Sequence, residues 1–376
     1  MLNDEIKGHD FQKEILKRAV SENLISHSYL FSGPDGIGKK LVANEFAKLI
    51  NCQTGGSLES DGCDCSSCSK IDKGIHPDVI YVQFEGVKNI KVEQIREGVE
   101  DRLFLKSFEG KCKVVIVDEA ERMSNGAQNA FLKTLEEPPP NSVIILITSN
   151  PDSLLPTIRS RCQLIRFNAL PEELIFNELK KRDDLSLEEA HICSKLSNGS
   201  LGRAFMMDSD LIEWRKELIQ FLMHLKPHSA IRIIGLAEYM PLTSTPEDME
   251  RMTLAFEFIS LWLRDLMLIK TDSDKKGITN IDLIESSNQI AEKWDLDKIL
   301  DKMGALNTKI IYRFLGITAM LNGVFMFLTV PFSVYHNEPE KWGILNAGII
   351  TVFIGVLLYF LNKPTNKSIQ KKEGYL

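Results

Sequence analysis

Short apolar runs alternate with amphipathic stretches over the first half of the chain. Four of these runs have the length and composition of buried strands, at residues 28–32, 79–82, 114–117 and 143–148. Helical spacing of apolar residues follows the first run at 39–50 and recurs between the others. Strands that alternate with helices predict a parallel sheet covered by helices, so we expect an α/β fold here.

The apolar pattern becomes helical after Phe167. Pro171 favours the start of one helix, and Ser186 followed three residues later by Glu189 is a capping box that opens another. The helical pattern then continues from about 210 to 304. We therefore predict an α/β domain at 1–168, a small helical lid at 169–208 and a separate helical domain at 209–304.

The last seventy or so residues differ in character from everything before them. Residues 314–334 and 342–361 each form an apolar run without a formal charge, and about twenty such residues suffice to span a bilayer. Lysines and an arginine flank the pair, which places both ends in the cytoplasm. Two buried core helices are the alternative, but the length of the runs favours a two-helix transmembrane hairpin within 305–376.

Composition and charge narrow the class of protein. The chain has 376 residues, enough for two or three domains, and its 44% apolar and 26% charged residues are typical of a globular protein. A net charge of -7 argues against a protein that coats nucleic acid by itself. The polar start MLNDEIKGHD is not a signal peptide, so we expect residues 1–304 in the cytoplasm.

The stretch GPDGIGKK at 33–40 matches the phosphate-binding pattern G-x-x-x-x-G-K of nucleotide-binding proteins. Gly33, Gly36 and Gly38 allow backbone N–H groups to surround phosphate oxygens, and Lys39 reaches the outer phosphates. The next position normally carries a Ser or Thr hydroxyl for Mg²⁺, but here it is Lys40. The alternative is a glycine turn with a chance lysine, although the predicted strand and helix on either side favour a phosphate loop.

A second motif, which is acidic, also supports a nucleotide site. The run VVIVDEAERM ends a predicted strand with Asp118 and Glu119. In a phosphate-loop fold, this aspartate holds the water shell of the metal and the glutamate orients an attacking water. Two solvated carboxylates at a strand end are the alternative reading.

Four of the seven cysteines, Cys52, Cys63, Cys65 and Cys68, lie in one short stretch. In a reducing compartment such a cluster indicates metal more than disulfides, and four thiolates suit tetrahedral Zn²⁺. Only one residue separates Cys63 from Cys65, where a two-residue gap is favoured. A cysteine-rich loop without metal therefore stays open as an alternative.

Six segments in one order carry a family resemblance: HSYLFSGPDGIGKK, HPDV, VDEAERMS, AQNAFLKTLEEPP, LLPTIRSRCQ and GSLGRA. Together they closely resemble the delta-prime subunits of bacterial DNA polymerase III clamp loaders, over residues 1 to about 300. The resemblance implies an AAA+ domain at 1–168 with a zinc module inserted at 52–68, a lid at 169–208 and an oligomerising collar at 209–304. The usual zinc module has two-residue gaps, so the spacing of the cysteines departs from the family pattern.

The resemblance also implies roles for single residues. Arg161, in Ser-Arg-Cys, matches the arginine finger that such subunits insert into a neighbour's ATP site. Asn150 matches the polar sensor of the γ-phosphate, and Arg203 matches the arginine of the second sensor. An ordinary surface arginine at 161 and a simple helix start at GSLGRA are the alternatives.

The family comparison favours a stator more than a motor. Delta-prime subunits are commonly poor ATPases, and Lys40 removes the magnesium hydroxyl, so ATP and Mg²⁺ are expected to be bound weakly or left unhydrolysed. Such a subunit acts with motor and delta subunits to place the sliding clamp on primer–template DNA. A catalytically active clamp-loader motor and a membrane-anchored AAA+ regulator of transport are the alternatives.

The tail resembles a different family. Residues 305–376 are similar to the N-terminal hairpin of a Trk-type potassium transporter subunit, down to the closing KKEGYL. The similarity stops before any ion filter, so we assign no transport activity to it. A chimera, from a gene fusion or from an assembly error, with membrane association through the tail, is the reading that this resemblance favours.

Overall fold

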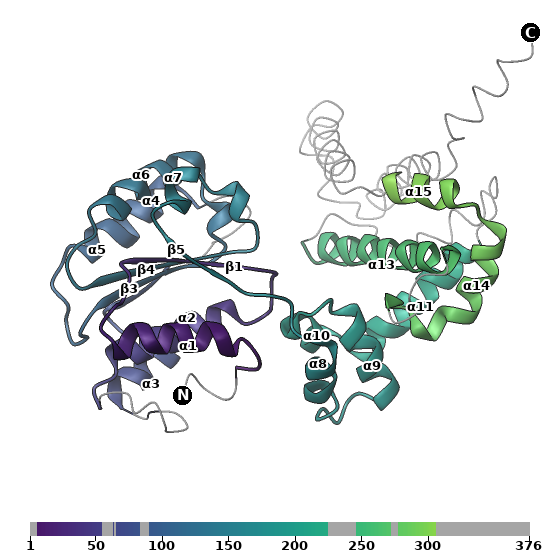
Figure 1. Ribbon diagram of the computed structural model, residues 1–376, viewed down its shortest axis with the longest axis horizontal. Coiled ribbons are helices and arrows are strands. Elements are labelled where there is room, and N and C mark those ends of the chain that lie inside the picture. Colours follow the sequence, from purple (N-terminus) through teal and green to yellow (C-terminus); the bar gives the residue numbers. More distant parts are fainter. Residues whose placement is uncertain are drawn as a thin grey trace, which may run out of the picture. The chain divides into compact units, whose positions relative to one another are not determined.

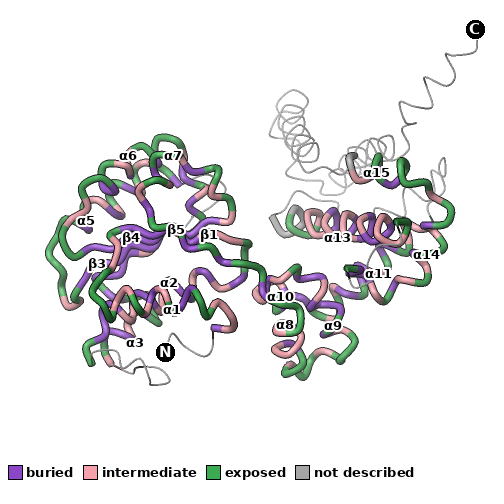
Figure 2. Tube along the Cα trace, in the orientation of Figure 1, coloured by how far each residue is buried: buried purple, intermediate pink, exposed green. Residues whose placement is uncertain are grey.

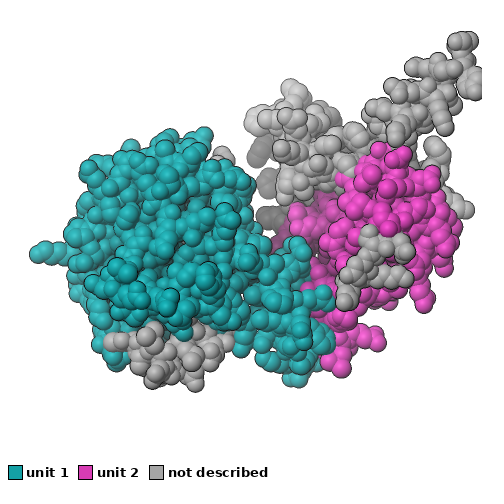
Figure 3. All heavy atoms as spheres, viewed as in Figure 1, with its two compact units in different colours: residues 1–183, 197–206 teal, residues 184–196, 207–376 magenta. Residues whose placement is uncertain are grey.

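The computed structural model describes residues 6–54, 63, 65–82, 90–224, 246–271 and 277–305. The chain divides into two compact units, one of residues 1–183 and 197–206 and the other of residues 184–196 and 207–376 (Figure 3). The domain boundaries predicted at 168 and 208 stay predictions. Each unit is described by itself below.

A five-stranded parallel sheet forms the centre of the first unit, in the order β2-β3-β4-β1-β5. The strands are β1 (Ser28–Ser32), β2 (Val79–Val82), β3 (Lys113–Val117), β4 (Ser142–Thr148) and β5 (Gln163–Arg166). The predicted parallel sheet is therefore confirmed, with four strands close to their predicted positions. The sequence analysis misses β5, an edge strand in which only Ile165 is buried, because its apolar pattern is too sparse to signal a strand.

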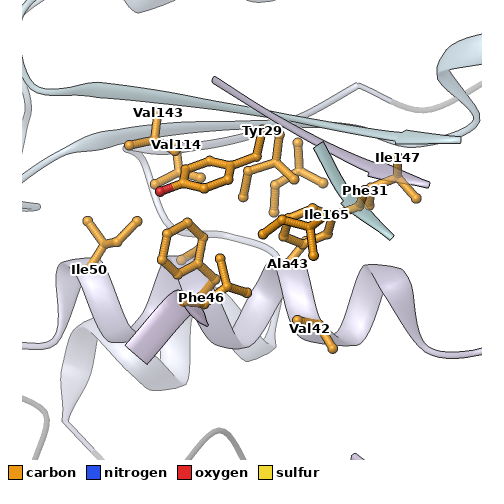
Figure 4. Close-up of a cluster of buried hydrophobic side chains, with 14 of the residues drawn as sticks. Tyr29, Phe31, Val42, Ala43, Phe46, Ile50, Val114, Val143, Ile147 and Ile165 are labelled. Carbon is orange, nitrogen blue, oxygen red and sulfur yellow. The ribbon is translucent and has the colours of Figure 1, made fainter. Parts of the chain in front are cut away.

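Helices cover both faces of the sheet (Figure 1). One face carries α1 (Asp10–Ser21), α2 (Lys39–Asn51) and α3 (Ser66–Asp72), and the other carries α4 (Val92–Ile95), α5 (Asp101–Leu103), α6 (Asn125–Glu136) and α7 (Pro156–Arg159). Successive strand residues point to opposite faces, so Tyr29 and Phe31 join one core while Leu30 joins the other. On the first face, Phe46 of α2 packs edge-on against Tyr29, with ring centroids 5.2 Å apart (Figure 4). Burial is continuous along the central strands (Figure 2).

Strand order brings three chain segments to one edge of the sheet. The carboxyl ends of parallel strands lie at the same edge, and β3, β4 and β1 are neighbours. The glycine loop follows β1, Asp118 follows β3, and Ser149 follows β4. The sheet therefore gathers the predicted nucleotide residues into one place.

The remaining helices are divided between the units. The first unit also contains α8 (Glu172–Leu179) and α10 (Leu201–Met206); the second contains α9 (Leu187–Leu196), α11 (Ser209–Met223), α13 (Pro246–Lys270), α14 (Ile284–Lys293) and α15 (Leu296–Ala305). Pro171 is the N-cap of α8, as predicted. The capping box is confirmed, because the Ser186 N–H donates to Glu189 Oε2 at 2.8 Å and the Glu189 N–H donates to Ser186 Oγ at 3.2 Å.

The two apolar runs of the tail, 314–334 and 342–361, lie outside the described residues. Among the helices that the structure does describe, none is both long enough and apolar enough to cross a bilayer. The transmembrane hairpin therefore stays a prediction from the sequence. So does the cytoplasmic location of residues 1–304.

Candidate functional site

The glycine loop joins β1 to α2, which is the strand–loop–helix setting that a phosphate loop requires. Gly36 and Gly38 have φ angles of 71° and 103°, which side chains rarely allow. A Cβ added to Gly38 would meet no atom within 4 Å, so the space beside it is open. The loop therefore forms a cradle at the N-terminus of α2, where N–H groups favour an anion.

Gly36 serves a different purpose from Gly38. The Gly202 N–H, in α10, donates to the Gly36 carbonyl at 2.8 Å. A Cβ at Gly36 would lie 2.4 Å from Ser200 Oγ, so only glycine permits this approach. One side of the loop is thus covered by the start of α10, while the side at Gly38 remains open.

The two lysines after the loop are both engaged by oxygens of the site. Lys39 is buried, and its Nζ donates to the carbonyls of Gly33 at 2.5 Å and Pro34 at 2.6 Å. Burial lowers the pKa of Lys39, although the negative charge of Asp35, 3.7 Å away, partly offsets this. The Lys40 Nζ lies 3.1 Å from Asp118 Oδ2, on side chains that are 40% and 26% exposed. The ammonium of Lys40 therefore pairs with the aspartate that is predicted to hold the metal's water shell.

The acidic residues after β3 have separate partners. Glu119 has the left-handed φ of 49° and lies 2.5 Å from Arg122 Nε. Glu121 instead accepts hydrogen bonds from the Ser149 hydroxyl at 2.6 Å and the Ser149 N–H at 3.1 Å. Burial acts to raise the pKa of Glu121, but these hydrogen bonds outweigh it and hold the pKa below its ordinary value. Glu121 and Ser149 are site residues that the sequence analysis misses.

A cavity of about 350 Å³ connects these groups. Its lining includes Gly38, Lys39, Lys40, Asp118 and Ser149, so the structure brings together the residues predicted from two separate motifs. Glu119 lines the cavity as well, beside Glu121.

The two predicted sensors are placed differently. Neither Asn150 nor Arg203 is among the described residues that line the cavity. Asn150 is exposed just beyond β4, and its N–H donates to Thr148 Oγ1 at 3.1 Å. Arg203 lies in α10, where its N–H donates to Ser200 Oγ at 3.3 Å. Their sensor roles stay predictions.

Arg161 is presented at the surface of the first unit, just after α7. Its guanidinium bonds to the Glu136 carboxylate at 2.7 Å and to the Thr157 carbonyl at 3.0 Å, and the side chain is 35% exposed. The backbone beneath it is fixed by Ser28, whose hydroxyl donates to the Arg161 carbonyl at 2.6 Å. The role of Arg161 as an arginine finger stays a prediction.

The four predicted zinc ligands converge. The Sγ atoms of the four cysteines all lie within 4.8 Å of one another, and those of Cys52 and Cys63 are 3.5 Å apart. Four thiolates around zinc, at about 2.3 Å per bond, form a tetrahedron with edges of about 3.8 Å. The one-residue gap between Cys63 and Cys65 therefore does not keep the thiols apart. The residues fit a tetrahedral metal.

Comparison with known proteins identifies the family of this chain. Residues 8–171 match a family model described as DNA polymerase III, delta subunit. The chain is 30% identical over 281 residues to the DNA polymerase III subunit delta' of Bacillus subtilis, which covers 74% of this chain and 82% of that protein. The chain belongs to the clamp-loader family of DNA polymerase III subunits. The recognition made from the sequence motifs is thereby confirmed at the level of the family.

Other DNA polymerase III relatives match this chain over only part of their own length. The DNA polymerase III subunit tau of Bacillus subtilis is 27% identical over 329 residues, covering 81% of this chain and 57% of its own length. The subunit gamma of Buchnera aphidicola subsp. Schizaphis graminum is 36% identical over 203 residues, covering 52% of this chain and 54% of its own length. The chain thus spans only about half of the tau and gamma relatives.

Two thiols of the cysteine cluster have pKa values shifted in opposite directions. Burial acts to raise the pKa of the Cys65 thiol, but N–H groups of Cys68 and Gln53 and the nearby thiols lower it to about 6. Burial raises the pKa of Cys68, and the other thiols raise it further. Without a cation, the cluster holds fewer than four thiolates.

Proposed function

We propose that this chain is a delta-prime-type stator of the DNA polymerase III clamp loader. It helps motor and delta subunits to load the sliding clamp onto primer–template DNA. The observation that carries the proposal is the ion pair between Lys40 and Asp118, because it puts an ammonium where a motor subunit holds Mg²⁺. The extent of the match to subunit delta', 82% of that protein, supports it.

The site fits phosphate groups but not the metal that normally accompanies them. Open space beside Gly38, the N–H groups of the loop and the buried Lys39 suit phosphate oxygens. No hydroxyl is available at position 40, and the Lys40 ammonium lies against the carboxylate that would face Mg²⁺. Since the metal stabilises charge that develops during phosphoryl transfer, its exclusion affects hydrolysis more than binding.

The isolated chain is expected to hydrolyse ATP negligibly. Steady-state phosphate release from the full-length protein measures this. A turnover on the order of 1 s⁻¹, which is ordinary for an ATPase, would instead make the chain a motor subunit. Lys40→Thr, which restores the hydroxyl, tests whether metal binding alone separates this chain from a motor.

Arg161 is the part of the chain that acts on a neighbour under this proposal. Its guanidinium contributes positive charge near the γ-phosphate in the ATP site of an adjacent motor subunit. The support is its exposure and its fixed position on Glu136 and Thr157. The chain thereby assists hydrolysis in another subunit while its own site does not turn over.

The cysteine cluster is proposed to hold one structural Zn²⁺. Metal analysis of the full-length chain, prepared without chelators, is expected to give one zinc per chain. Cys65→Ser should lose the metal, whereas Cys112→Ser, which alters a buried cysteine outside the cluster, should retain it. Well under one zinc per chain in the unmodified protein would favour a loop without metal.

Reconstitution tests the function as a whole. The full-length chain is mixed with motor and delta subunits, and co-purification and DNA-dependent ATPase are measured. A stator is expected to join the complex and to raise its clamp-loading activity. Failure to co-purify with these subunits would contradict the proposed role.

A further inference from the structure

We propose that the phosphate loop binds a nucleoside polyphosphate without Mg²⁺, with the Lys40 ammonium in the position of the metal. The inference deepens the proposed function and rests on it for the use of this loop. The stator would then bind a nucleotide without hydrolysing it.

The inference rests first on the position of Lys40. Lys40 lies in the first turn of α2, one residue after the buried Lys39. Its Nζ approaches Asp118 Oδ2 to 3.1 Å across the cavity beside the loop. In a phosphate-loop enzyme that carboxylate faces the water shell of Mg²⁺. The ammonium thus lies between the loop and the acidic motif, as the metal does in such enzymes.

The inference rests second on the N–H donors of the Lys40 ammonium. An ammonium has three N–H donors and no acceptor. Lys40 can therefore keep its bond to Asp118 and donate to a phosphate oxygen at the same time. A hydroxyl at this position has a single O–H donor, so it cannot donate to Asp118 and to a phosphate oxygen at the same time. The substitution removes the metal's ligand and supplies a fixed positive charge in one change.

Among the described residues that line the cavity, the cationic side chains are those of Lys39 and Lys40. Glu119 pairs with Arg122, and Oε1 of Glu121 accepts from Ser149, whereas Oε2 of Glu121 is buried and has no hydrogen-bond partner among the described residues. Lys39 is held by carbonyls of its own loop and is nearly enclosed. A phosphate that enters at the open side beside Gly38 would meet both ammonium groups. A Mg²⁺ ion at the same place would be repelled by Lys40.

The test compares ATP binding to the full-length chain in excess Mg²⁺ and in EDTA, by isothermal titration calorimetry. The unmodified chain is expected to bind ATP at least as tightly in EDTA, because Mg²⁺ competes with Lys40 for the same oxygens. Lys40→Thr should reverse this preference, with affinity about tenfold or more higher in Mg²⁺, the equivalent of one added favourable contact. Mn²⁺ added with ATP should give a protein-bound paramagnetic signal only in Lys40→Thr.

Two further variants locate the binding. Lys39→Ala should abolish it in both conditions, which confines it to the loop. Lys181→Met, which removes an exposed lysine paired with Glu178, should leave both affinities unchanged. Tighter binding of ATP in Mg²⁺ than in EDTA by the unmodified chain, or no binding in either, would overturn the inference.

The same preparations separate this inference from the proposed function. A chain that joins motor and delta subunits but binds no ATP without Mg²⁺ contradicts only the inference. A chain that binds ATP in EDTA but never joins those subunits supports the inference and contradicts the stator role.

Discussion

Arg161→Ala is expected to lower the DNA-dependent ATPase of the reconstituted clamp loader while the fold of the chain is retained. An arginine finger given in trans is worth about 10³ or more in rate at a single site. The effect on the whole complex should be smaller, because only one of its interfaces changes. Fold retention is expected because the side chain is 35% exposed and its ion pair with Glu136 lies at the surface.

Two variants make this measurement specific. Arg159→Ala removes a neighbouring arginine of similar exposure, 36%, which pairs with Asp152, and should leave the ATPase unchanged. Arg161→Lys keeps the positive charge but loses the planar fork of donors, so an intermediate rate is expected. If Arg161→Ala leaves both ATPase and clamp loading unaffected, the arginine-finger assignment is wrong.

The central sheet was predictable because its strands carry dense apolar runs between clear helical patterns. Such runs are buried on both faces in a parallel sheet, and the structure buries every residue of β3 and β4. The edge strand β5 was missed for the opposite reason, since three of its four residues are exposed. Local pattern identifies a strand only where burial is high.

The candidate site was predictable where a motif is contiguous. The glycine loop and Asp118 were found because each belongs to a short stretch with its own chemistry. The ion pair of Lys40 with Asp118 and the bonds of Glu121 to Ser149 were not, because they depend on the order of strands in the sheet. Strand order depends on tertiary packing, and it cannot be read from a single sequence.

The motif HPDV shows the same limit. The sequence analysis used it only as a mark of the family. In the structure Asp78 is buried, and its carboxylate accepts N–H groups of Phe108, Glu109 and Gly110 at 2.7–2.9 Å. Burial acts to raise the pKa of Asp78, but these N–H groups hold it below its ordinary value. The residue fixes the loop before β3, a role that only the three-dimensional contacts reveal.

A buried arginine in the second unit was also invisible in the sequence. Arg215 of α11 is fully buried, and its guanidinium bonds to the side chains of Asn280 and Asp282. Asp265 of α13 accepts the N–H groups of Thr279 at 3.1 Å and Asn280 at 2.8 Å. This network joins α11 and α13 to the segment that leads into α14.

Arg215→Ala is expected to destabilise the second unit by about 2–5 kcal/mol, the usual cost of truncating a large, fully buried side chain to Ala. The variant leaves Asp282 without its cation and opens a cavity beside Asn280. Tryptophan fluorescence during denaturant unfolding measures this selectively, because Trp214, Trp262 and Trp294 lie in the described part of the second unit and the sequence of the first unit contains no tryptophan.

Two comparisons decide whether the loss of the Arg215 contacts is the cause. Arg251→Ala removes an arginine whose guanidinium lies 4.8 Å from the Trp214 ring centroid, and a contact of that kind is worth about 0.5–1 kcal/mol at an exposed site. Combining Arg215→Met with Asp282→Asn removes both charges, so the double variant should lose less stability than the sum of the two single variants. An Arg215→Ala protein that unfolds at the denaturant concentration of the unmodified chain would show that the network contributes nothing to the second unit.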